Sequence, residues 1–100
     1  MKSRSNHLLL AFLLVTVRLA ADWPQFRGPD GQGHSAEKGI PIHWAEDENI
    51  SWKTVVPGQG WSSPVIAGKQ VWMTSAEAEG KSLHAVCIDK TGGKLLHNVE

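Results

Sequence analysis

The chain has 100 residues, of which ten are basic and ten are acidic, so its formal net charge at neutral pH is zero. This balance gives no electrostatic reason to expect nucleic acid or an anionic membrane surface as a partner. Cys87 is the single cysteine, which excludes an intrachain disulfide and a zinc site built from several thiolates.

Residues 1–21 have the three-part layout of a secretory signal peptide. Basic residues at the front are followed by the apolar run 8–17 and a pair of alanines, and this layout predicts cleavage after Ala21. The apolar run is shorter than the roughly 20 residues that a membrane-spanning helix needs. An uncleaved short anchor is the alternative, because Arg18 and Leu19 suit a cleavage site poorly. We therefore expect a secreted or periplasmic protein of a bacterial cell envelope, without a stable membrane span.

Residues 22–49 are predicted to form an N-terminal arm and a loop. The first part, 22–33, holds two prolines and three glycines among two aromatic residues, which forbids a regular helix and disfavours a central strand. We expect Trp23 and Phe26 to pin this part as an ordered arm. The second part, 34–49, has no sustained hydrophobic period and is typical of a surface loop.

Residues 50–100 are predicted to be all-β, because short runs rich in Val, Ile, Trp and Thr alternate with turn residues. Gly68 and Lys69 suit a tight two-residue connection between two of these runs. The run 82–89 is apolar on both faces, so we expect neighbours on both sides of it. The expected strands are 50–56, 62–67, 70–75, 82–89 and 94–100.

Three stretches carry the most specific signals, namely the arm 23–33, the block 50–66 and the segment 83–94. Together they make residues 22–100 resemble the secreted quinoprotein-like β-propellers that are built from pyrroloquinoline quinone (PQQ) repeats. The repeat core of that family usually runs Ala, Asp, a spacer, Thr or Ser, Gly, Lys and then a Trp on the outer strand. Ala85, Asp89, Gly93 and Lys94 fit this frame, whereas Gly92 stands at the hydroxyl position and His97 at the Trp position.

The resemblance implies a fold for residues 50–100. They would form an antiparallel β-propeller blade, that is, the first blade plus a closing strand, in which 50–56 completes the sheet of the last blade. Such a sheet has two apolar faces and needs neighbouring sheets to cover them. Complete relatives carry several repeats, so we expect this chain to be a truncated N-terminal fragment.

The resemblance also implies two functional classes. The first is an exported scaffold or binding module, non-catalytic in this fragment, with protein partners in the cell envelope. The alternative is the N-terminal part of a PQQ-dependent quinoprotein dehydrogenase, in which PQQ would sit on the propeller axis beside Ca²⁺. No catalytic or metal-binding residue is predicted, no cofactor-binding residue can be assigned, and PQQ is expected only in a complete propeller.

Several other residues suggest sites, and for each of them we favour a structural role. The tryptophans could form a platform for a sugar or a quinone but are expected to pack between sheets. The histidines lack the spacing of metal ligands, and the acidic residues lack the ligand period of a calcium loop. The serines lack a nucleophile elbow. The glycines lack the preceding strand, the following helix and the Lys of a phosphate loop. These residues are Trp23, Trp44, Trp52, Trp61, Trp72, His34, His43, His84, His97, Ser62, Ser63, Gly28, Gly31, Gly33, Asp30, Asp47 and Glu48.

Overall fold

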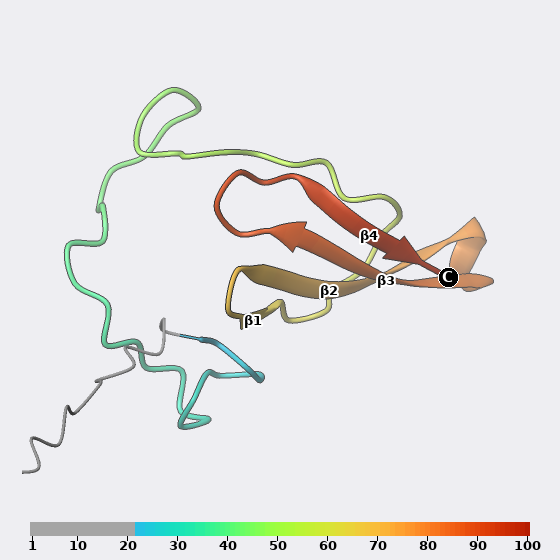
Figure 1. Cartoon of the computed structure of the whole chain (residues 1–100), viewed down its shortest axis with the longest axis horizontal. Coiled ribbons are helices and arrows are strands. Elements are labelled where there is room, and N and C mark those ends of the chain that lie inside the picture. The colour runs from blue at the N-terminus through green and yellow to red at the C-terminus, as the bar shows by residue number, and fades with distance from the viewer. Residues whose placement is uncertain (1–21) are drawn as a thin grey trace, which may run out of the picture.

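The structure, a computed structural model, describes residues 22–100, and the predicted signal peptide 1–21 lies outside the described residues. A long irregular segment leads into one open antiparallel sheet, whose four strands follow each other in chain order (Figure 1). This confirms the predicted all-β character. The elements are β1 (Val65–Ala67), β2 (Gln70–Glu77), a short 3-10 helix η1 (Ala78–Gly80), β3 (Ser82–Asp89) and β4 (Leu95–Val99).

The turn between β3 and β4 is organised by Asp89. Its Oδ2 accepts a hydrogen bond from the backbone N–H of Gly92 at 2.8 Å. Its carbonyl accepts from the N–H of Gly93, and its own N–H donates to the carbonyl of Lys94, both at 2.8 Å. Asp89 therefore fixes the geometry of this turn through both its side chain and its backbone.

Cross-strand pairs divide the sheet into two faces that differ in burial. Residues directly opposite each other on neighbouring strands point to the same face. The inner face carries Ile66, Val71, Met73, Ser75, His84, Val86 and Ile88, and the open face carries Val65, Trp72, Thr74, Ala76, Leu83, Ala85, Cys87, His97 and Val99. Val86 and Ile88 are 0% and 2% exposed, whereas Leu83 and Val99 are 68% and 57% exposed. The core therefore lies mainly on the inner face.

Segment 50–56 has the alternation of a strand but pairs with no strand within residues 22–100. Its alternate side chains are half-buried, namely Trp52, Thr54 and Val56. Trp52 Nε1 donates to the carbonyl of Lys90 at 3.0 Å, and the Thr54 hydroxyl donates to the carbonyl of Gly93. The segment is therefore held by side-chain hydrogen bonds to the β3–β4 turn rather than by a backbone ladder, and its closing-strand role stays a prediction.

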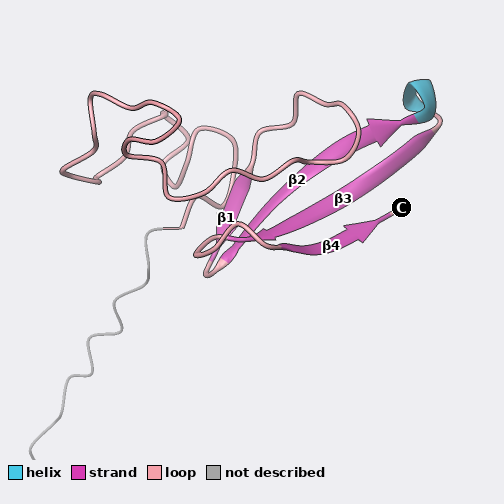
Figure 2. Ribbon diagram, turned by 90° about the horizontal axis from the view of Figure 1, so that it is seen from above, coloured by secondary structure: helices cyan, strands magenta, loops and turns pink. Residues whose placement is uncertain are grey.

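The chain then returns along the free side of β2 (Figure 2). Gln59 and Ala76 exchange backbone hydrogen bonds of 2.8 and 2.7 Å. Ser62 replaces the backbone contact at the next position, because its Oγ donates to the carbonyl of Thr74 at 3.1 Å and accepts from the Thr74 N–H at 2.9 Å. Regular pairing begins only after Pro64, which has no N–H to donate. The predicted strand 62–67 is therefore shortened to β1.

The N-terminal arm covers the outer edge of β1. Trp23 exchanges backbone hydrogen bonds of 3.1 and 2.8 Å with Ile66. Its indole packs on Gly28, where a Cβ would lie 2.6 Å from the ring. The prediction that Trp23 pins the arm is confirmed, but the one for Phe26 is wrong, because its side chain is 67% exposed and meets the Arg27 guanidinium at 5.4 Å.

Candidate functional site

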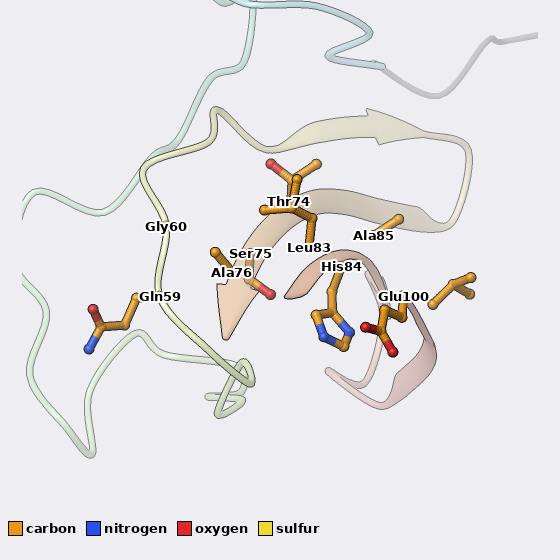
Figure 3. Close-up of a pocket in the computed structure, with 10 residues that line it drawn as sticks. Gln59, Gly60, Thr74, Ser75, Ala76, Leu83, His84, Ala85 and Glu100 are labelled. Carbon is orange, nitrogen blue, oxygen red and sulfur yellow. The ribbon is translucent and has the colours of Figure 1, made fainter. Parts of the chain in front are cut away.

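The open face of the sheet carries a shallow groove of about 530 Å³ (Figure 3). It is lined by two rows of paired residues, Thr74 with Ala85 and Val99, and Ala76 with Leu83. The lining also includes the polar residues Ser75, His84 and Glu100. Gln59 and Gly60 form one side of the groove. The small side chains of the floor leave the hollow.

Gly60 allows the chain to pass close beside the groove. A Cβ at this position would lie 3.0 Å from the carbonyl oxygen of Thr74 and 3.4 Å from the Cα of Ser75. A larger residue would push this segment away from β2. The neighbouring Trp61 is fully exposed, with a relative accessibility of 104%. The groove is therefore bordered by a large aromatic side chain that contacts solvent.

A stacked aromatic pair lies on the same face, one row along the strands. Trp72 and His97 both pair with Cys87, from the strands on either side of it. Their rings stack with centroids 5.9 Å apart and an interplanar angle of 13°. Trp72 Nε1 also donates to Gln70 Oε1 at 3.1 Å. The two stacked rings thus lie on either side of Cys87 in the register of the sheet and cover its side chain.

Cys87 is fully buried beneath this pair, with 0% exposure. Burial disfavours the thiolate and raises the pKa of the Cys87 thiol above its ordinary value of 9.0. A thiol held neutral at physiological pH is a poor nucleophile and a poor metal ligand. Cys87 is therefore a packing residue.

A polar cluster at the far end of the inner face is the arrangement that sequence reasoning missed. His84 Nε2 lies 2.8 Å from Ser82 Oγ and 3.5 Å from Glu77 Oε2, and His84 Nδ1 lies 2.9 Å from Asn98 Oδ1. The Ser82 hydroxyl donates to Glu100 Oε1 at 2.8 Å. The strand alternation of 82 and 84, with 98 on the next strand, was the available signal.

The distances in this cluster are similar to those of a nucleophile, a base and an orienting amide. A serine hydroxyl has one proton, and Ser82 gives it to Glu100 rather than to His84. Because that proton goes to the Glu100 carboxylate, the cluster lacks the serine-to-histidine donation that joins a nucleophile to its base. We therefore interpret the cluster as a cross-strand polar network that joins β2, β3 and β4.

The histidines and acidic residues that the sequence offered as metal ligands do not gather at one place among the described residues. No three His, Cys, Asp or Glu side chains within residues 22–100 lie close enough to hold a metal ion. Asp30 instead accepts from the N–H of Gln32 at 2.9 Å and lies 3.8 Å from His34 Nδ1, and Glu46 pairs with Lys53 at 2.6 Å.

The glycine-rich arm uses its N–H groups internally. Those of Gly28, Gly31 and Gly33 donate to the carbonyls of Gln25, Gly28 and Arg27 at 3.0, 3.0 and 2.8 Å. They are not directed together toward an anion, so the turn interpretation of this segment is confirmed.

The tryptophans fall into two groups. Trp23, Trp52 and Trp72 are half-buried and packed, as expected. Trp44 and Trp61 are 67% and 104% exposed, so the expectation of packing is wrong for these two within the described chain. The burial of a large ring depends on what neighbours it, which a local pattern does not show.

No protein-family model matches the chain, and the searches of curated proteins and of solved structures found no match either. Among the residues that the structure describes, no helix has the length and apolar character needed to cross a bilayer.

Proposed function

We propose that this chain is an exported β-propeller blade of the PQQ-repeat-like class that serves as a non-catalytic binding or scaffold module in the bacterial cell envelope. The observation that carries the proposal is the exposed apolar surface of the open face. Leu83 and Val99 are 68% and 57% exposed beside the groove, and Trp61 stands free at its border. Apolar patches of this kind mark contact surfaces in soluble proteins.

The blade assignment rests on the shape of the sheet and on the repeat core. An up-and-down sheet of four strands is the unit of a propeller blade. Asp89 organises the β3–β4 turn, and Gly93 accepts the docking of segment 50–56. A neighbouring blade or a protein partner would cover the open face by packing side chains against the floor of the groove. The chemistry that this surface offers is apolar contact with a polar rim.

Site-specific photo-crosslinking in producing cells tests the proposal. A benzophenone amino acid at Leu83, on the open face, is expected to yield adducts with a discrete envelope protein. The matched control is Val55, which is apolar and 91% exposed but lies outside the groove. Equal adduct patterns at the two positions, or no adduct at Leu83, would contradict a docking role for the open face.

A quinone titration tests the alternative class. The native envelope product that contains this chain is purified and mixed with PQQ and Ca²⁺, and quinone binding is followed by absorbance together with the reduction of an artificial electron acceptor. The scaffold proposal expects neither saturable binding nor alcohol- or sugar-dependent dye reduction. Stoichiometric binding with dye reduction would favour the dehydrogenase prediction instead.

A further inference from the structure

Residues 49–51 read Asn-Ile-Ser, which is an acceptor pattern for N-linked glycosylation, because a hydroxyl residue stands two positions after an asparagine and no proline lies between them. The other asparagines of the chain, Asn6 and Asn98, are followed at that position by Leu8 and Glu100. Asn49 is therefore the one asparagine of the sequence with this pattern. The structure shows whether an enzyme could reach it.

Asn49 lies at the base of a protruding turn. Ala45 and Glu48 exchange backbone hydrogen bonds of 3.0 and 3.2 Å, which closes a tight turn, and Asn49 follows with a φ of +59°. This loop, drawn in green in Figure 1, projects away from the four-stranded sheet. The side chains of Asn49 and Ser51 are both exposed. The two residues that a transferring enzyme must hold are therefore accessible together.

The alternation of segment 50–56 keeps the acceptor pattern on the solvent side. Trp52 and Thr54 bond to the β3–β4 turn, whereas Ser51 and Lys53 between and beside them are exposed. The segment forms no backbone ladder within residues 22–100. An enzyme can thus hold the Ser51 hydroxyl without displacing Trp52 from its packed position.

The Asn49 amide can receive a sugar and keep its own contact. Its Nδ2 donates a hydrogen bond to the carbonyl of His43 at 2.8 Å. A carboxamide nitrogen carries two hydrogens, and glycosylation replaces one of them. The hydrogen that remains can still donate to His43, and this bond would hold the first sugar beside residues 42–44.

Apolar side chains at that place give such a sugar a physical role. Ile42 and Trp44 stand on either side of His43 and are 83% and 67% exposed. Exposed apolar groups that lie together promote unwanted association in a soluble protein. An N-linked glycan is bulky and solubilising, so one anchored at Asn49 would cover these two side chains.

We propose that Asn49 is the acceptor of an N-linked oligosaccharide, which shields Ile42 and Trp44 in the exported protein. The donor is an oligosaccharide linked to a polyprenyl diphosphate. Asn49 Nδ2 bonds to the anomeric carbon of the first sugar, and the bond between that carbon and the diphosphate oxygen breaks. The polyprenyl diphosphate leaves, and a base of the transferring enzyme takes the amide proton. No group is oxidised or reduced.

The charge beside the acceptor indicates what the transferring enzyme recognises. Glu46, Asp47 and Glu48 directly precede Asn49. Complementary charge gives specificity to such encounters, so the enzyme would present a basic acceptor groove. The inference rests on the export that is part of the proposed function, but it does not use the groove of the open face.

Mass spectrometry of the native envelope product tests the proposal. Trypsin should release residues 39–53, because Lys38 and Lys53 bound them, and we expect most copies of this peptide to carry an oligosaccharide on Asn49. The same digest reports export, since cleavage after Ala21 leaves 22–27 as the N-terminal peptide. A product that begins at Asp22 with an unmodified Asn49 overturns this inference and leaves the proposed function standing. A cytoplasmic product that retains residues 1–21 contradicts both.

Variants of the acceptor pattern separate enzymatic transfer from chance modification. Asn49→Gln and Ser51→Ala should each lower the occupied fraction at least tenfold, whereas Ser51→Thr keeps a hydroxyl and should keep the glycan. The matched control is Ser63→Ala, which removes another exposed hydroxyl outside the pattern and should have no effect. Asp47→Asn should lower the occupied fraction severalfold. A glycan that survives Ser51→Ala overturns the assignment.

Dye binding tests the shielding. The glycosylated protein should bind less of a fluorescent hydrophobic dye than the Asn49→Gln variant, because Ile42 and Trp44 are uncovered in the variant. Adding Ile42→Ser to Asn49→Gln should reverse part of that increase. Equal dye binding by the glycosylated protein and the Asn49→Gln variant would contradict the shielding role.

Discussion

Replacing Gly93 with alanine tests how segment 50–56 is fixed to the sheet. Gly93 is buried and has a φ of +73°, and a Cβ there would lie 2.6 Å from the Trp52 ring and 2.8 Å from Thr54 Oγ1. The substitution therefore combines backbone strain with a collision. Since Trp52 and Thr54 are the side chains that bond to this turn, the new methyl group displaces both.

The expected loss of stability follows from these two terms. A left-handed φ costs an L-residue roughly 1–2 kcal/mol relative to glycine. Moving the indole breaks its hydrogen bond to Lys90, which contributes about 1 kcal/mol, and reduces its packing. The total loss in unfolding free energy for Gly93→Ala is about 2–4 kcal/mol, measured by urea unfolding with tryptophan fluorescence as the probe.

Two other glycines separate the cost of backbone strain from the cost of the collision. Gly68 has a φ of +58° and nothing within 4 Å of its Cβ position, so Gly68→Ala shows the strain alone, about 1–2 kcal/mol. Gly92 lacks a left-handed φ and its Cβ would lie 3.4 Å from Asp89 Oδ2, so Gly92→Ala should change stability by about 0.5 kcal/mol or less. In a Trp52→Ala background the cost of Gly93→Ala should fall toward that of Gly68→Ala. A Gly93→Ala variant no less stable than Gly68→Ala would refute the reasoning.

Three further changes have definite expected outcomes. Ser62→Ala removes both hydrogen bonds to Thr74 and should lower stability by about 1–2 kcal/mol, with faster hydrogen exchange at the Thr74 amide. Ser75→Ala should be neutral or raise stability by up to about 1 kcal/mol in a thermal melt, because Ser75 Oγ is buried with no partner among the described residues. Because burial raises the pKa of the Cys87 thiol, the folded protein holds its proton longer than the unfolded chain as pH rises. The contribution of Cys87 to stability is then fully present below the ordinary pKa of 9.0 and is lost at more alkaline pH. Urea unfolding between neutral and alkaline pH should show a loss of unfolding free energy that the control variant Cys87→Ala lacks.

The strands of the sheet could be predicted wherever local signals were sufficient. The strand at 82–89 has the predicted bounds, and β2 begins where predicted but runs to Glu77. A two-residue connection with Gly68 in the left-handed region fixes the register of that hairpin. These features depend on alternation and turn residues, which a sequence displays directly.

Contacts between distant segments could not be predicted in the same way. The pairing of Trp23 with Ile66 and the position of 50–56 over the β3–β4 turn join residues more than thirty positions apart. The sequence of 50–56 predicts a strand, but a ladder also requires a free edge beside it. In the described chain 50–56 forms no backbone ladder with a strand edge, and the Trp52 indole donates to a carbonyl of the β3–β4 turn instead.

The candidate surfaces were predictable in part. The apolar residues on both faces of 82–89 indicate that both faces need neighbours. Within the described residues the open face lacks such a cover, because Leu83 and Val99 on it are exposed. The stack of Trp72 on His97 could not be predicted, since in the repeat core His97 is only a departure from the usual Trp. The His97 ring stacks on Trp72, which lies two strands away. Its packing role therefore follows from the strand register and not from the local motif.

The groove selects what it can bind by shape and by the balance of apolar and polar groups in its lining. Its floor presents side chains, so whatever binds there must supply apolar groups that fill a hollow. Its polar members, such as His84 and Glu100, are already engaged in hydrogen bonds within the sheet, so apolar contact is the main attraction that the groove offers.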